Sequence, residues 1–208
     1  MPTALDAIAA LKGKWVGVKD RASLDHPAIN VPAADLLAVL GSLKADHGFD
    51  MLTDVSGVDW AIGTSPRFSV VYHVFSTTGH EYVRVSVDCA DDAKPQVPSA
   101  AGLWPGADWH EREAFDMFGI TFAGHPDLRR ILMWDGYPYH PLRKDFPLAG
   151  IETELPDAEV TAETKVGAIA APMMGGPFVA SSGELNMTDA EPRAKDESWT
   201  ERRPKPDA

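Results

Sequence analysis

The sequence predicts an α+β fold: a small, mostly antiparallel sheet with helices packed on one face, followed by an extended C-terminal segment. Two observations carry this prediction. Leucines recur at helical spacing within residues 32–48, and two later stretches alternate between apolar and polar residues, as half-buried strands do. A short turn at residues 76–79 separates the alternating stretches, which makes them an antiparallel hairpin.

The first helix is predicted over residues 32–48. Pro32 suits its first position, because the N–H that proline lacks would have no partner there. Gly48 is placed to end it, since glycine readily adopts the left-handed conformation found at helix C-termini. The leucines that follow Pro32 at helical spacing are Leu36, Leu37, Leu40 and Leu43.

Three strands are predicted after this helix, over residues 51–60, 68–75 and 82–88. Gly57 interrupts the first of them and indicates a β-bulge at that position. The residues expected to face the core from the other two strands are Phe68, Val70, Tyr72 and Val74, followed by Val83, Val85 and Val87.

A second helix is predicted over residues 108–119. Asp108 is expected to cap its first turn, and Glu111 is expected to return a hydrogen bond to the backbone of the cap. Gly119 is placed to end this helix. The aromatic residues that share one of its faces are Phe115 and Phe118.

Composition divides the chain into an α+β domain (1–120), an extended interface segment rich in proline and arginine (121–150) and an acidic tail (151–208). Prolines and glycines within residues 124–148 exclude a long helix or an inner strand there. The segment still carries many large apolar residues, which a second chain would bury. The polar tail is expected to order mainly on partners.

The charge and cysteine content exclude several classes of protein. A formal net charge of −12 argues against a nucleic-acid binder and against docking on anionic lipid. A single cysteine, Cys89, cannot form an internal disulfide, hold an ordinary iron–sulfur cluster or build a Cys-rich zinc site. Any electron carrier is therefore expected on another chain.

Targeting and membrane-spanning segments are not predicted. The first residues lack the basic start of a secretory signal, and the uncharged stretch 166–183 is broken by glycines and prolines. We therefore expect a soluble chain on the cytoplasmic side, which meets a membrane only through partners.

No catalytic constellation is evident. The run that begins at His110 resembles the start of a zinc-protease helix, but Ala114 stands where the second histidine is needed. A metal triad of His110, His125 and His140 matches no known ligand spacing, although a free-standing metal hydrolase that uses it stays an alternative. Catalytic, cofactor-binding and metal-binding residues are therefore not expected.

Two basic spots, Arg129-Arg130 and Arg143-Lys144, stand out in this acidic protein. They suit ion pairs with an acidic partner surface or internal pairs with Asp127, Asp135 and Asp145. Phosphate binding is less favoured, because no glycine-rich loop opens a helix here.

Five short runs follow one another in order between residues 111 and 147. They are Glu111-Arg112-Glu113, Phe115-Asp116-Met117-Phe118-Gly119, Gly124-His125-Pro126, Leu128-Arg129-Arg130-Ile131-Leu132 and His140-Pro141-Leu142-Arg143-Lys144-Asp145-Phe146-Pro147. Together they resemble the signature of the C subunit, or 30-kDa subunit, of respiratory complex I (NADH:quinone oxidoreductase). A run this long is far more specific than one short motif. At one position Tyr139 stands where the family usually has glycine, so strain or a different turn is expected there.

The resemblance implies a non-catalytic scaffold in the peripheral arm of the complex, on the cytoplasmic side of the bacterial inner membrane. It implies contacts with the D subunit, which helps to form the quinone pocket, and with neighbouring cluster-carrying chains. FMN and iron–sulfur clusters would lie on partner chains, and this chain would carry no cofactor.

The implied structural residues of the helix are Glu111, Arg112, Glu113, Phe115, Asp116 and Phe118. The expected partner-interface residues are Arg129, Arg130, Trp134, His140, Arg143, Lys144, Asp145 and Phe146. The alternative within the same superfamily is the equivalent subunit of a membrane-bound hydrogenase or of a complex with another electron donor.

Overall fold

The computed structural model describes residues 3–147 and 151. The chain divides into two units, Met1–Asp145 and Phe146–Ala208, and the fold described below is that of the first unit. The acidic tail expected over residues 151–208 lies outside the described residues, apart from Ile151.

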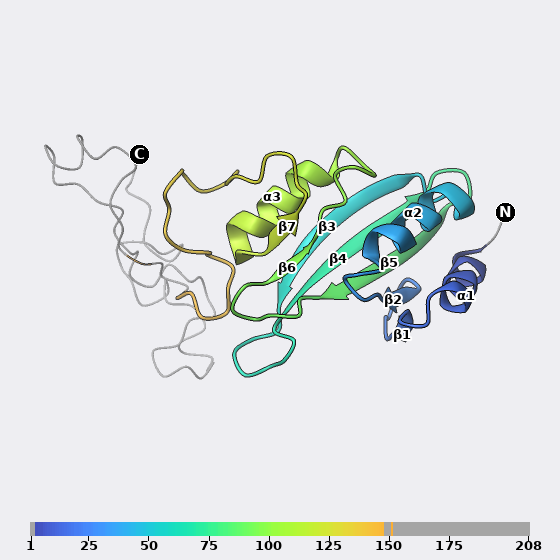
Figure 1. Ribbon diagram of the computed structural model, residues 1–208, viewed down its shortest axis with the longest axis horizontal. Helices are drawn as coiled ribbons and strands as arrows, with labels where there is room; N and C mark the ends of the chain where they lie inside the picture. The colour runs from blue at the N-terminus through green and yellow to red at the C-terminus, as the bar shows by residue number, and fades with distance from the viewer. Residues whose placement is uncertain (1–2, 148–150, 152–208) are drawn as a thin grey trace, which may run out of the picture. The chain divides into compact units, whose positions relative to one another are not determined.

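Three helices and seven strands follow one another along the first unit (Figure 1). A five-stranded sheet has the order β1-β2-β5-β4-β3, and β6 and β7 form a separate parallel pair. Only the β2–β5 pairing of the large sheet is parallel, so the predicted mostly antiparallel sheet is confirmed. The elements are α1 (Ala4–Lys14), β1 (Lys19–Arg21), β2 (Ala28–Asn30), α2 (Leu36–His47), β3 (Met51–Asp59), β4 (Phe68–Ser76), β5 (Glu81–Asp88), β6 (Gln96–Pro98), α3 (Ala107–Phe118) and β7 (Thr121–Ala123).

The β4–β5 hairpin forms the centre of the sheet, as the alternating sequence predicts. Tyr72 pairs with Val85 and Val74 with Val83, so the apolar residues of both strands share one face. All seven residues predicted to face the core are fully buried. The period of two in this part of the sequence therefore identifies the buried face correctly.

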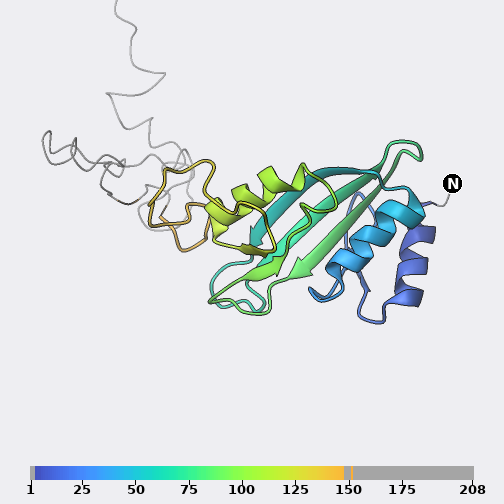
Figure 2. The same cartoon turned by 45° about the horizontal axis from the view of Figure 1, so that its top comes forward.

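All three helices contribute to the core on this face of the sheet. The buried leucines of α2 and the buried apolar residues of α1 belong to one cluster with the hairpin, and α1 and α2 pack side by side (Figure 2). Gly57 of β3 lies opposite Val70 on the same face, and Phe118 of α3 packs against it. The prediction of helices on one face is confirmed.

Gly57 has a different role from the predicted bulge. The register of β3 shifts between Leu52 and Asp54, whereas Gly57 pairs regularly. A Cβ atom at position 57 would lie 2.7 Å from Cδ2 of Phe118, so glycine is required for the close approach of α3. The predicted bulge at Gly57 was wrong because close packing, and not an extra residue, explains the glycine.

The predicted first helix ends where expected but begins later. Gly48 has φ of 74°, and its N–H donates to Leu43. At the other end Leu36 is the first helical residue, and Pro32 opens a preceding turn that Asp35 closes with a 3.0 Å hydrogen bond. The assignment of Pro32 to the first helical position was wrong, because proline suits the start of a turn equally well.

Helix α1 was not predicted. Thr3 and Asp6 form a capping box at its start, and the buried residues Ile8 and Leu11 join the core. The Thr-x-x-Asp spacing was therefore a signal for this helix in the sequence.

Candidate functional site

Helix α3 carries the first part of the signature, up to Phe118, and several of its charged side chains are buried. The helix begins after Gly106 without a side-chain cap, so the predicted capping by Asp108 and Glu111 was wrong. Glu111 is fully buried and accepts hydrogen bonds from Ser99 Oγ and from the backbone N–H of Ala100, both at 2.6 Å. Burial raises the pKa of Glu111, although these two hydrogen bonds oppose the shift.

Asp116, also fully buried, holds the chain that follows α3 and β7. Its Oδ2 accepts hydrogen bonds from three successive backbone N–H groups, those of Ile131, Leu132 and Met133, at 3.0, 2.7 and 2.8 Å. Its Oδ1 pairs with the guanidinium of Arg130 at 2.5 Å. Burial alone would raise the pKa of Asp116, but these donors bring it below its ordinary value.

Arg112 reaches the same segment from the next turn of the helix. Its guanidinium donates to the carbonyl oxygens of Arg129 and Arg130 at 3.2 and 3.3 Å, and it is buried. Glu113, between these buried residues, is exposed. Helix α3 therefore holds the backbone of residues 129–133 through hydrogen bonds, in addition to the side chain of Arg130.

A third buried carboxylate, Asp59 at the end of β3, ties the later part of the segment to the sheet. It pairs through both oxygens with Arg67, at 2.9 and 2.7 Å, and accepts the backbone N–H of Lys144 at 2.8 Å. Arg67 also pairs with Asp145 at 3.0 Å. Burial alone would raise the pKa of Asp59, but Arg67 and the backbone donors lower it to about 2.

The C-terminus of α3 receives two further side chains of the segment. The ring Nδ1 of His140 donates to the carbonyl of Asp116 at 2.9 Å, and Nε of Arg143 donates to the carbonyl of Phe118 at 2.6 Å. Both side chains pack on Gly119, where a Cβ atom would lie 2.5 Å from Arg143 Nη2 and 2.6 Å from His140 Nε2. Gly119 also has φ of 72°, so it ends the helix and makes room for both side chains.

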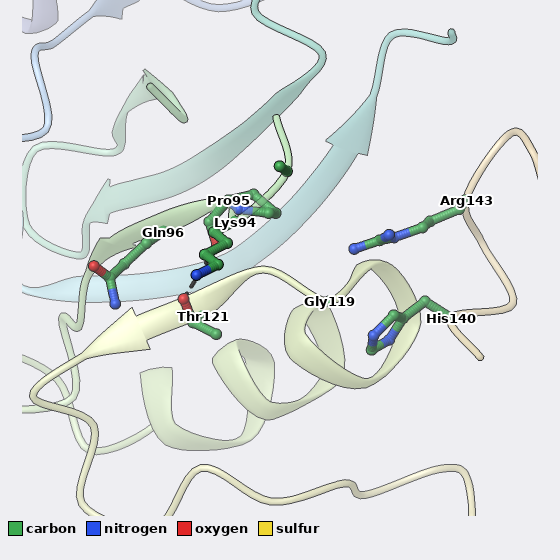
Figure 3. Close-up of a pocket in the computed structure, with 8 residues that line it drawn as sticks. Lys94, Pro95, Gln96, Gly119, Thr121, His140 and Arg143 are labelled. Atoms are coloured by element: carbon green, nitrogen blue, oxygen red, sulfur yellow. Dashed lines mark hydrogen bonds between the residues drawn. The ribbon is translucent and has the colours of Figure 1, made fainter. Parts of the chain in front are cut away.

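A pocket of about 430 Å³ opens beside this helix end (Figure 3). Figure 3 shows Lys94 and Gln96 on one side, His140 and Arg143 on the other, and Gly119 between them. The remaining lining residues are Ala93, Pro95 and Thr121.

The residues predicted for a partner interface differ in their surroundings. The side chains of four of them bond to α3 or to Arg67, and these residues are Arg130, His140, Arg143 and Asp145. Arg129 is largely exposed and pairs with Asp127, and the Lys144 side chain is exposed. Trp134 packs edge-on against Tyr137, and Phe146 begins the second unit. Their contact with a partner stays a prediction.

Asp59 and Arg67 were not predicted from the sequence. The signal for them was an acid at the end of one predicted strand and a base just before the next, which a hairpin brings together. At Tyr139 no left-handed backbone is needed, because among residues 3–147 only Ala61 and His80 combine a side chain with positive φ. The expected strain at Tyr139 is therefore absent.

The three histidines of the metal-hydrolase alternative have separate partners. Within the described part of the chain, no group of three or more histidine, cysteine or acidic side chains could hold a metal ion. The side chain of His125 is fully buried, and its Nδ1 accepts the N–H of Asp127. The contacts of the other ring nitrogens are His110 Nδ1 with Asp54, His125 Nε2 with the carbonyl of Asp108, and His140 Nδ1 with the carbonyl of Asp116.

Over residues 3–147, no helix is both long and apolar enough to cross a membrane. The comparisons with known proteins identify the family. Residues 29–152, more than half of the chain, match the family described as "Respiratory-chain NADH dehydrogenase, 30 Kd subunit". The chain belongs to this family. The resemblance drawn from the signature is therefore confirmed, and the chain is one of the 30-kDa subunits of a multisubunit respiratory complex.

Relatives of this chain are named as the C subunit of NADH-quinone oxidoreductase. One from Moorella thermoacetica is 48% identical over 141 residues, which cover 68% of this chain and 93% of the relative. One from Phenylobacterium zucineum is 51% identical over 119 residues, which cover 57% of this chain and 56% of the relative. A third, from Rhizobium meliloti, is 42% identical over 152 residues, which cover 71% of this chain and 82% of the relative.

The fold of this chain also occurs in a solved structure of the membrane-bound sulfane sulfur reductase, an archaeal respiratory membrane complex. The similarity has a TM-score of 0.59 at 21% sequence identity and covers 78% of this chain and 91% of the other. At this identity the similarity concerns the fold.

Proposed function

We propose that this chain is a non-catalytic scaffold of the peripheral arm of a proton-pumping NADH:quinone oxidoreductase. In this proposal it lies on the cytoplasmic side of the bacterial inner membrane and packs against the D subunit and neighbouring cluster-carrying chains. FMN and iron–sulfur clusters on partner chains carry electrons from NADH to quinone. The chain itself supports the structure of the arm and carries no redox group.

The observation that carries the proposal is a segment with a fixed backbone and exposed apolar side chains. The N–H of Leu132 donates to Asp116 and that of Leu142 to the carbonyl of Met117, so both backbones are held. Their side chains are nevertheless 58% and 52% exposed. Exposed leucines on a preorganised backbone suit a protein interface, because little conformational freedom remains to be lost on binding.

The bonding of the buried acids supports a structural role. The oxygens of Glu111, Asp116 and Asp59 accept hydrogen bonds from the chain's own N–H and O–H groups. Groups that are engaged in this way stabilise the fold and are poor candidates for exchanging protons with a substrate.

The test is to tag this chain in its native host, extract membranes with a mild detergent, and determine the particle mass and partner chains. We expect a particle of several hundred kilodaltons that contains a D subunit, flavin and iron, and that oxidises NADH. A chain that runs alone at its own mass would overturn the proposal.

A second candidate is the equivalent subunit of a complex with another electron donor. The shared fold with the sulfane sulfur reductase complex favours it. It predicts a large particle that contains iron but does not oxidise NADH. The same experiment therefore separates the two candidates.

A further inference from the structure

The pocket at the C-terminus of α3 is basic, although the chain has a net charge of −12. Arg143 and Lys94 line it from opposite sides (Figure 3). The ammonium group of Lys94 makes no hydrogen bond or ion pair with any residue in the described ranges. Both cations therefore line the pocket, and none of the described residues that line it is acidic.

The guanidinium of Arg143 is positioned but not neutralised. Its Nε donates to the carbonyl of Phe118, and its Cζ lies 5.1 Å from the centroid of the Phe68 ring. Neither Nη1 nor Nη2 donates a hydrogen bond within residues 3–147. The nearby Asp145 and Asp59 act on Arg143 only through longer-range electrostatics, because their ion pairs are with Arg67.

Partial burial makes an anion favourable at this position. Burial lowers the pKa of Arg143, because the charged guanidinium has lost part of its water. The two Nη groups form a fork that matches the two oxygens of a carboxylate. Lys94 and the amide of Gln96 lie across the pocket as further donors.

Gly119 keeps the floor of the pocket clear. Any side chain there would collide with both Arg143 Nη2 and His140 Nε2. Because His140 donates from Nδ1 to Asp116, its Nε2 faces Gly119 as an acceptor. Because Gly119 has no side chain, the two Nη groups of Arg143 stay accessible from the pocket.

We propose that this pocket receives the carboxylate of an aspartate or glutamate side chain from a partner chain of the complex, between Arg143 and Lys94. This inference rests on the proposed function. A protein carboxylate fits better than a free phosphate, because four backbone N–H groups of the pocket lining already have partners and cannot surround a tetrahedral anion; they belong to Ala93, Gly119, Thr121 and Arg143.

Zero-length cross-linking tests the proposal directly. A carbodiimide joins a lysine amine to a carboxylate that is in contact with it, so Lys94 of the intact extracted complex should become linked to an acidic residue of another chain. Mass spectrometry of the digested complex would identify the linked peptides. In Lys94→Arg this link should be lost while the complex still assembles, since arginine keeps the charge but does not react.

Charge reversal provides the second measurement. Lys94→Glu should dissociate from the complex at least about tenfold faster than the unaltered chain, because a like charge would face the carboxylate. Lys19→Glu is the matched control: Lys19 is also exposed and makes no ion pair among the described residues. Its dissociation rate should be unchanged.

The outcomes separate the two proposals. Two results would overturn the proposal that the pocket receives a carboxylate, while the scaffold function would stand. One is an assembled complex in which Lys94 links to no other chain. The other is equally slow dissociation of Lys94→Glu and Lys19→Glu. A chain that assembles with nothing overturns both.

Discussion

Two buried acids on α3 show how hydrogen bonding decides the ionisation of a carboxyl group. Glu111 and Asp116 are both fully buried, yet the pKa of Glu111 is raised and that of Asp116 is lowered. Glu111 accepts two hydrogen bonds, whereas Asp116 accepts four that include one from a guanidinium. Burial therefore dominates at Glu111, and the donors dominate at Asp116.

Replacement of the better-bonded acid should be costly. We expect Asp116→Asn to lower the free energy of unfolding of the full chain by about 3 kcal/mol, because Arg130 and three backbone N–H groups lose a charged acceptor. Urea unfolding measures the loss. Glu113→Gln, an exposed acid on the same helix, should change stability by less than about 0.5 kcal/mol. Equal unfolding midpoints for the two variants would contradict this role for Asp116.

The pKa of Asp59 gives a pH dependence with a definite sign. Its folded value of about 2 lies below the usual 3.8, so its contribution is complete above the unfolded value and is lost as the pH falls toward 2. Between pH 5 and pH 3 the free energy of unfolding should lose about 1 kcal/mol through this group. The stability difference between the unaltered chain and Asp59→Asn should shrink by that amount. A difference that stays constant over this range would refute the assignment.

At the scale of elements, the contact between β3 and α3 depends on a missing side chain. Gly57→Ala would place a Cβ atom 2.7 Å from Phe118 and should destabilise the fold by about 2 kcal/mol. Gly13→Ala makes the same change inside α1, where nothing lies within 4 Å, and should be neutral or slightly stabilising. Thermal unfolding of both variants checks the expectation, which fails if Gly57→Ala melts no lower than Gly13→Ala.

Elements with strong local patterns were predictable, and those that depend on distant residues were not. The β4–β5 hairpin and the end of α2 follow from alternation and from Gly48. Strand β1 is Lys19–Arg21, an entirely charged stretch, and it is a strand only because β2 pairs with it. The parallel β2–β5 pairing likewise has no local signal, since its partners are far apart in sequence.

In the candidate site, too, local sequence patterns were informative, whereas contacts between distant residues were not predictable. The order of the signature runs identified the family, but it did not reveal that Asp116 binds the backbone of residues 131–133. A buried acid and an exposed acid have the same appearance in a sequence, as Glu111 and Glu113 demonstrate. Only the fold separates the residues that hold the segment from those that a partner can reach.

At the scale of the whole molecule, the proposed interface is best tested by substituting a residue whose side chain does not stabilise the fold. Arg143 is unsuitable for this purpose because it bonds to Phe118, whereas the Leu142 side chain is about half exposed. Leu142→Asp should reduce recovery of the complex at least about tenfold, because a charge would replace an apolar contact. Native-gel quantification of the tagged particle measures the effect.

The matched control for this change is Leu24→Asp, since Leu24 is fully exposed between β1 and β2. The isolated Leu142 and Leu24 variants should both unfold like the unaltered chain. If Leu142→Asp assembles as well as Leu24→Asp, the leucine does not lie in an interface.

The bond between Asp59 and the N–H of Lys144 joins positions 85 residues apart in the chain. During synthesis the sheet that holds Asp59 leaves the ribosome well before Lys144 does. Lys144 can make this bond only where the strand that carries Asp59 is in place, so the segment depends on a sheet that has formed. In the proposed complex, a copy whose sheet has failed to form would lack the ordered segment that a partner is expected to contact.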